Sequence, residues 1–162
     1  MKITLNPNAK DAATRDALVA EGGFGKYYTD HMVICEWSEK DGWGEPHLMP
    51  YGPISLDPAT AVFHYGQEIF EGMKAYRQPD GSIALFRPTA NAKRFANSAR
   101  RLALPEMPVE LFMETVEALV KQDAGWVPSK VGESLYIRPF MIATEVGLGV
   151  RPWANTQSNL CC

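Results

Sequence analysis

The turn Pro79-Asp80-Gly81 restricts the fold of this 162-residue chain more than any other feature of its sequence. It separates two short segments, GMKAYR (72–77) and SIALFR (82–87), and the first alternates apolar and polar residues as a strand does. Proline presets the backbone at the start of a turn, and aspartate and glycine suit the positions that follow. The sequence therefore predicts a β-hairpin, which places this part of the chain in an antiparallel sheet.

Helical spacing of apolar residues follows the hairpin. A stripe predicts a helix within residues 89–104, made by Phe95, Ala99, Leu102 and Ala103. A second amphipathic helix is predicted at 108–122, with Pro108 near its start. Residues 59–70 are expected to form a third, short helix. The chain therefore combines the hairpin with two or three helices.

Two further segments are typical of strands. Residues 28–37 are rich in β-branched and aromatic residues, and residues 133–145 form an apolar strand that Pro139 is expected to interrupt. Strands followed by helices and a closing strand describe the α+β class, an antiparallel sheet covered by helices.

The chain divides into four parts by composition. Residues 1–23 are polar, end in two glycines and are expected to form a mobile N-terminal arm. The α+β domain is expected to span 24–145, and 146–152 is typical of the start of a connection to another domain. Residues 153–162 have no periodicity, so neither helix nor strand is predicted there.

Composition excludes several classes of protein. The formal net charge of −3 argues against a nucleic-acid surface, and no apolar run approaches the length of a membrane span. The N-terminus lacks the apolar core of a signal peptide, so a cytoplasmic protein is expected. Three cysteines, two of them adjacent at the end, form no disulfide framework, and Cys35 is expected in a buried strand. His64 has no partners at ligand spacing, so no metal site is predicted.

Arg94 is the first candidate for binding chemistry. An arginine in the first turns of a helix can hold a phosphate, but basic helical faces are more often simply solvated. A nucleic-acid surface on the same helix is the weaker alternative, made by Lys93, Arg94, Arg100 and Arg101. It is disfavoured by the acidic total charge and by the lack of interleaved aromatic residues.

Tyr136 and Arg138 form a second candidate. They lie two residues apart in a predicted strand, so they share one face of the sheet. A buried arginine beside a tyrosine hydroxyl could bind a carboxylate through two hydrogen bonds. The alternative is an edge pair that extends to water.

Seven segments together resemble the branched-chain amino acid aminotransferases, which are pyridoxal-phosphate enzymes of fold type IV. They are FGKYYTDHM (24–32), GWGEPHLMPYGPISLDPA (42–59), HYGQEIFEGMKAYR (64–77), LFRPTANAKR (85–94), SARRLALP (98–105), DAGWVP (123–128) and SLYIRPFMIATEVGLGV (134–150). The resemblance implies the N-terminal small domain of the fold shared with D-amino acid aminotransferase, within a homodimer.

The resemblance also implies roles for individual residues. It assigns an apolar pocket for the substrate side chain to Phe24, Tyr65, Phe70 and Tyr136. Arg138 matches an arginine near the substrate, and Arg94 matches the arginine that contacts the phosphate of pyridoxal 5'-phosphate. Leu148 and Val150 match a loop that reaches the partner subunit's active site.

The implied activity is transamination of leucine, isoleucine and valine with 2-oxoglutarate. The family's Schiff-base lysine matches no lysine of this chain, and none follows Lys130. We therefore expect a truncated small domain with a foreign tail, inactive alone. The alternative is a non-catalytic fragment that pairs with full-length subunits.

Overall fold

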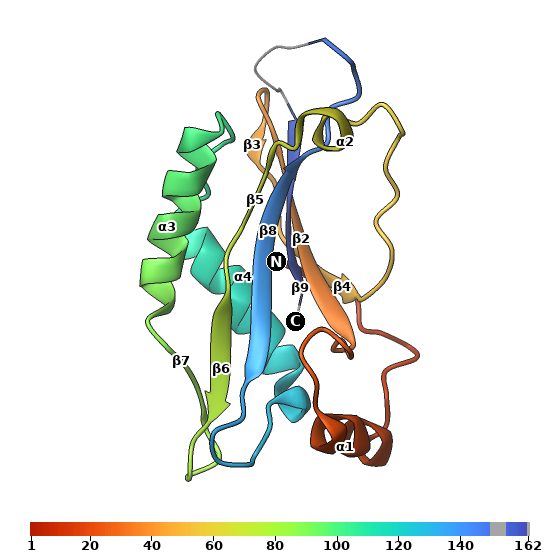
Figure 1. Ribbon diagram of the computed structural model, residues 1–162, viewed down its shortest axis with the longest axis vertical. Helices are drawn as coiled ribbons and strands as arrows, with labels where there is room; N and C mark the ends of the chain where they lie inside the picture. The colour runs from red at the N-terminus through yellow and green to blue at the C-terminus, as the bar shows by residue number, and fades with distance from the viewer. Residues whose placement is uncertain (150–154, 162) are drawn as a thin grey trace.

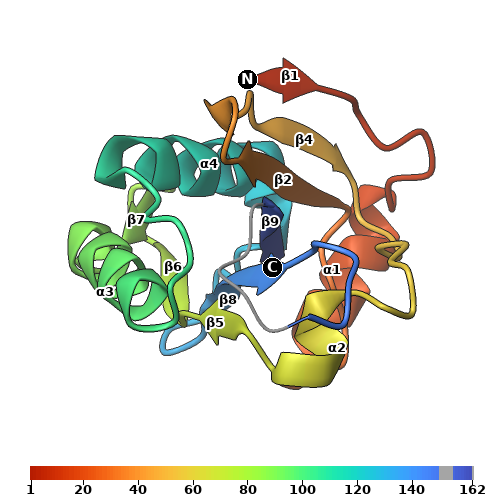
Figure 2. The same cartoon turned by 90° about the horizontal axis from the view of Figure 1, so that it is seen from above.

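One sheet organises the part of the chain that the structure, a computed structural model, describes, namely residues 1–149 and 155–161. Its nine strands follow the order β1-β4-β2-β9-β8-β6-β7, with β3 paired to β2 and β5 paired to β8 (Figure 1 and Figure 2). The strands are β1 Lys2–Ile3, β2 His31–Ser38, β3 Gly42–Trp43, β4 His47–Pro50, β5 Glu68–Phe70, β6 Met73–Arg77, β7 Ile83–Leu85, β8 Leu135–Ala143 and β9 Asn155–Cys161. The strands pair antiparallel, apart from β1, which runs parallel to β4. The predicted α+β class is confirmed.

The predicted hairpin is present as β6 and β7. Tyr76 pairs with Ala84, and the backbone N–H of Gln78 donates to the carbonyl of Ser82 at 2.8 Å. Asp80 Oδ1 accepts the Ser82 backbone N–H at 2.9 Å, and Gly81 adopts φ 86°. The aspartate therefore hydrogen-bonds the backbone of the turn, and the glycine supplies its left-handed conformation, as the sequence predicts.

Two long helices form the core with the sheet. The two long helices are α3 Pro88–Arg101 and α4 Val109–Gln122. The other helices are α1 Ala12–Glu21 and α2 Ala61–Tyr65, and a 3₁₀ turn is present at Ala124–Trp126. Figure 2 shows α3 and α4 together on one side of the strands. Phe95 of α3 and Phe112 of α4 are fully buried, with ring centroids 5.5 Å apart. They share one apolar cluster with Ile137 and Met141 of β8.

The end of α3 differs from the prediction. Phe95 and Ala99 are buried as predicted, but the helix ends at Arg101 and the Leu102 side chain is 40% exposed. Ala103 takes φ 54°, which reverses the chain so that the Leu104 N–H donates to the Ala99 carbonyl at 2.9 Å. Leu104 is buried in place of Leu102, because the left-handed residue ends the helical period.

Two other expectations around β8 were wrong. The helix expected over 59–70 is only α2, because Gly66 takes a left-handed φ of 58° and the chain then enters β5. Pro139 does not interrupt β8. It lies opposite the break between β5 and β6, where its carbonyl accepts the Glu71 N–H at 2.8 Å. Because the neighbouring strand is interrupted opposite Pro139, the backbone N–H that proline lacks is not needed for pairing with β5 or β6.

The N-terminal arm has ordered elements, contrary to prediction. Strand β1 pairs with β4, and α1 begins with the Asp11 side chain accepting the Thr14 N–H at 2.8 Å. The Asn6 N–H donates to His31 Nε2 at 2.9 Å. A helix cap, a long-range strand pairing and a single long-range hydrogen bond leave no apolar periodicity in a sequence, which is why the sequence predicts only an arm there.

The segment 155–161 also differs from prediction, since it forms β9 between β2 and β8. Its backbone pairs antiparallel with both neighbours, for example Leu160 with Val33 and with Pro139. Backbone pairing on both edges requires no side-chain alternation, so periodicity could not reveal this strand. The proposed domain boundaries remain predictions. None of the described helices is long and apolar enough to span a bilayer.

Candidate functional site

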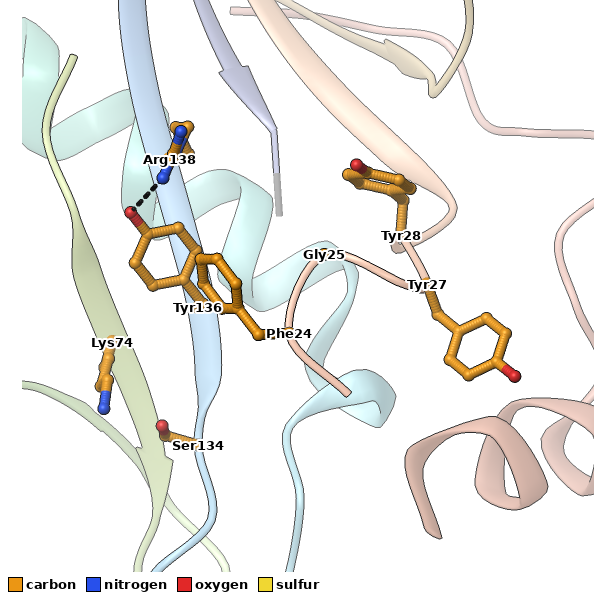
Figure 3. Close-up of a pocket in the computed structure, with 8 residues that line it drawn as sticks. All are labelled: Phe24, Gly25, Tyr27, Tyr28, Lys74, Ser134, Tyr136 and Arg138. Atoms are coloured by element: carbon orange, nitrogen blue, oxygen red, sulfur yellow. Dashed lines mark hydrogen bonds between the residues drawn. The ribbon is translucent and has the colours of Figure 1, made fainter. Parts of the chain in front are cut away.

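A cavity of about 550 Å³ opens between the loop before β2 and the strands β6 and β8 (Figure 3). Its lining is mostly aromatic and basic, and consists of Phe24, Gly25, Tyr27, Tyr28, Lys74, Ser134, Tyr136 and Arg138. Figure 3 shows Phe24 against the Tyr136 ring, with Tyr27 and Tyr28 on the far side of the space. The cavity is a candidate for an apolar ligand that carries a negative charge.

Strand alternation presents Tyr136 and Arg138 on the cavity side. Ile137, between them, is fully buried on the other face of β8. Arg138 Nη2 donates to the Tyr136 hydroxyl at 3.1 Å, and Lys74 of β6 is the register partner of Tyr136. The predicted shared face is therefore confirmed.

Two phenylalanines complete an aromatic cluster around this pair. The Phe24 ring meets the Tyr136 ring edge-on, with centroids 4.8 Å apart and an interplanar angle of 71°. The Arg138 guanidinium lies 4.7 Å from the Phe70 centroid. The Arg138 side chain is exposed, but its guanidinium packs on aromatic rings and β8 is not an edge strand, so carboxylate binding by the pair stays a prediction.

Tyr65 lies apart from this cluster. It is the last residue of α2, whose first N–H, that of Ala61, donates to the Glu145 carbonyl just beyond β8 at 2.9 Å. The Tyr65 hydroxyl donates to the Leu148 carbonyl. Tyr65 and Phe70 do not line the described cavity, although both side chains are exposed. The structure thus brings Tyr65 and Leu148 together, and Val150 lies outside the described residues.

Arg94 is held by a buried carboxylate. Arg94 Nε donates to Glu71 Oε1 at 2.9 Å, and Nη2 donates to Oε2 at 2.7 Å. Asn91 Nδ2 donates to the same Oε2 at 2.9 Å. Burial opposes ionisation of Glu71, but the hydrogen bonds from Arg94 and Asn91 outweigh it and hold the pKa of the carboxyl below its usual value. Arg94 is therefore not a merely solvated residue of a basic face.

A second cavity, of about 320 Å³, adjoins Arg94. Arg87 lines it, and Lys74 and Tyr136 line both this cavity and the larger one. The two cavities therefore meet at the Lys74–Tyr136 strand pair. Among the described residues, no group of His, Cys, Asp and Glu side chains could hold a metal ion.

Sequence reasoning missed Glu71 and the reason for Gly72. A Cβ at Gly72 would lie 2.6 Å from the Tyr136 hydroxyl oxygen, so a side chain there would force the tyrosine ring to shift. A glycine directly before a strand was the available signal for such a close approach. Glu71, 8% exposed, offered no signal, because charged residues are rarely buried unless paired.

Curated proteins match the sequence over most of its length. The chain is 60% identical over 153 residues to a probable branched-chain-amino-acid aminotransferase of Streptomyces coelicolor, covering 93% of this chain and 42% of that protein. It is 54% identical over 146 residues to the branched-chain-amino-acid aminotransferase of Mycobacterium tuberculosis, covering 90% of this chain and 40% of the relative. No protein-family model matches. The chain spans about 40% of the length of these relatives.

Solved structures agree in fold. The branched-chain amino acid aminotransferase of Escherichia coli superposes with a TM-score of 0.62 at 21% identity, over 82% of this chain and 40% of that one. A second such enzyme, from T.th. and complexed with N-(5'-phosphopyridoxyl)-L-glutamate, gives a TM-score of 0.57 at 26% identity, over 78% of this chain and 39% of that one. The sequence resemblance and the fold expected from it are confirmed.

Proposed function

We propose that this chain, which is related in sequence to the branched-chain amino acid aminotransferases over nine-tenths of its length, forms the small, N-terminal domain of such an enzyme. The enzyme would transfer the amino group of leucine, isoleucine or valine to 2-oxoglutarate, as a cytoplasmic homodimer. The contact of Phe24 with Tyr136 and Arg138 at one cavity, with Phe70 packed behind the Arg138 guanidinium, carries the proposal.

The aromatic cluster suits branched apolar side chains. Phe24 and Tyr136 offer ring surfaces to the cavity. Such surfaces discriminate one methylene by only about 1–3 kcal/mol, so all three amino acids should be accepted. Arg138 would orient a substrate carboxylate, since its guanidinium is fixed against Phe70 and Tyr136.

Pyridoxal 5'-phosphate is the cofactor that the resemblance implies. Arg94 fits its phosphate, because a guanidinium fixed on one edge by Glu71 keeps further N–H donors for an anion. When bound, the cofactor would supply an electron sink. The chain's own residues would hold the phosphate and shape the substrate pocket, and the Schiff-base lysine would come from the length of the enzyme that this chain does not match.

The test compares the chain alone with a fusion. The fusion joins this chain to the unmatched remainder of the Streptomyces coelicolor relative, and both are assayed with leucine, 2-oxoglutarate and pyridoxal 5'-phosphate. We expect glutamate from the fusion, with similar rates for leucine, isoleucine and valine, and none from the chain alone. A folded fusion that forms no glutamate would contradict the proposal.

Exposed apolar side chains favour a second candidate, a non-catalytic partner of full-length subunits. Phe63, Phe70 and Leu148 are each more than 60% exposed. Such a partner should copurify with the full-length relative when both are expressed and should lower its activity. Unchanged activity at a large excess of the chain would exclude this function.

A further inference from the structure

We propose that Glu71 is a positioning residue, which fixes the Arg94 guanidinium so that its outer edge forms a prebuilt phosphate site. The inference rests on the proposed function, because it concerns the residue assigned there to the cofactor phosphate. It adds Glu71 to the phosphate site as a residue that acts only through Arg94. Three observations carry it, namely the anchoring of Glu71, the donors that Arg94 retains, and the charge of the adjoining cavity.

Glu71 is itself firmly held. It lies in the break between β5 and β6, where its N–H donates to the Pro139 carbonyl at 2.8 Å. Asn91, 7% exposed, donates from Nδ2 to Glu71 Oε2 at 2.9 Å and to the Gly72 carbonyl at 3.1 Å. The backbone of Glu71 is therefore tied to the sheet and its carboxylate to α3, so the carboxylate can impose a direction on Arg94.

Arg94 retains donors on the side away from Glu71. A guanidinium carries five N–H groups in one rigid plane, and Glu71 receives one from Nε and one from Nη2. The remaining edge, Nη1 with the second N–H of Nη2, has no partner within the residues that the structure describes. The Arg94 side chain is 62% exposed, so this edge is open to an anion. Two N–H groups in one plane suit two oxygens of a phosphate.

The negative charge of Glu71 could also weaken phosphate binding, by repelling the phosphate. Lys74, Arg87 and Arg94 all line the cavity of about 320 Å³, so Glu71 leaves a surplus of positive side chains there. A guanidinium that is already fixed loses less rotamer freedom when it binds. Positioning and repulsion therefore predict effects of opposite sign when the charge of Glu71 is removed.

The experiment titrates the full chain with pyridoxamine 5'-phosphate, whose amine cannot form imines with lysines, and follows its ³¹P resonance. Pyridoxamine, without the phosphate, is titrated by calorimetry. We expect Glu71→Gln to weaken binding of the phosphate compound roughly tenfold, by analogy with the loss of a residue that orients a metal ligand. Binding of pyridoxamine should not change.

A matched control involves another arginine of α3. Arg100 donates two hydrogen bonds from its guanidinium to Glu106, which lies beyond the end of the helix, and both side chains are exposed. Glu106→Gln should leave the phosphate compound unaffected. Arg94→Ala should abolish phosphate-dependent binding, and Glu71→Gln should then have no further effect. Arg94→Lys keeps the positive charge but lacks the planar N–H donors of the guanidinium, so it should weaken binding as Glu71→Gln does. It replaces Glu71→Gln in the test if that variant fails to fold.

The outcomes separate this inference from the proposed function. Tighter or unchanged phosphate binding in Glu71→Gln, or no saturable binding by the unaltered chain, would overturn the positioning role. If the fusion still forms glutamate, the proposed function stands without it. If the binding pattern is as expected and the folded fusion forms no glutamate, the inference is supported and only the proposed function falls.

Discussion

Single residues in this chain have effects that depend on one or two neighbours. Gly72 leaves room for the Tyr136 ring, and hydrogen bonds from Arg94 and Asn91 lower the pKa of the Glu71 carboxyl. Neither relation is visible in the residue type, since it arises only when β6, β8 and α3 come together. Both relations can be tested by small substitutions.

Gly72→Ala should destabilise the domain. The added Cβ would meet the Tyr136 hydroxyl oxygen at 2.6 Å and a ring carbon at 3.1 Å, so the ring must move and break its bond to Arg138. We expect a loss of about 1–3 kcal/mol in the free energy of unfolding, measured by urea denaturation. Gly52→Ala is the control, because a Cβ there meets nothing within 4 Å. Equal stability of the two variants would contradict this account of Gly72.

Glu71 should make stability depend on acid. Its pKa in the folded chain is lowered from an ordinary value of 4.5, so the carboxylate contributes stability above that pH. The contribution is lost as the pH falls through the lowered pKa. The difference in free energy of unfolding between the unaltered chain and Glu71→Gln should therefore shrink below about pH 4.5. A difference that stays constant from pH 7 to pH 3 would show that the ionised carboxyl contributes nothing.

At the scale of elements, the predictions from sequence succeeded where periodicity and turn chemistry agreed. The β6–β7 hairpin and the buried faces of α3 and α4 follow from the sequence. Besides the helix over 59–70 and the interruption at Pro139, prediction failed at α1, at the end of α3 and at β9. These three depend on capping, a left-handed residue or backbone pairing, none of which leaves a repeating apolar pattern.

Ala103→Gly should stabilise the end of α3. Ala103 holds φ 54°, a conformation that costs an L-residue roughly 1–2 kcal/mol and costs glycine nothing. After the greater backbone entropy of glycine is subtracted, a gain of about 0.5–1 kcal/mol remains. Ala96→Gly, in the middle of the same helix, should lose a similar amount. Thermal unfolding of both variants compares the signs, and destabilisation by both would refute a strained Ala103.

At the scale of the whole molecule, buried polar contacts join the N-terminal segment to the sheet and to the end of α4. His31 of β2 hydrogen-bonds through Nδ1 to Asp123 Oδ1 at 2.7 Å, and its Nε2 accepts the Asn6 N–H at 2.9 Å. Asp30 accepts the Trp126 indole N–H at 2.8 Å. Segments distant in sequence are thus joined by contacts that no local pattern predicts.

Trp126→Phe should weaken this junction. The substitution removes a hydrogen bond to the buried Asp30 carboxylate, and bonds to charged groups contribute about 1.5–3 kcal/mol. The control is Trp43→Phe, since that indole donates at 3.1 Å to the Glu106 carbonyl in an exposed setting. Urea unfolding followed by far-UV circular dichroism should show the larger loss at position 126. A larger loss at position 43 would refute the importance of the junction.

The candidate site was predictable only through the family motifs. Those motifs named Phe24, Phe70, Tyr136 and Arg138, and the structure brings these four together. From the residues alone, only the shared face of Tyr136 and Arg138 could be inferred. The meeting of the loop before β2 with β8 is a long-range contact, so no spacing within either segment contains it.

The position of β9 has a consequence for how the protein is made. Among the described strands, β9 is the last to be synthesised, yet it lies between β2 and β8. While a ribosome is still extending the chain, each of these two strands presents an unpaired edge that could add a strand from another molecule. β2 and β8 can be joined into one sheet only when residues 155–161 have emerged from the ribosome. A nascent chain that stalls before them therefore exposes two strand edges that can pair with other chains.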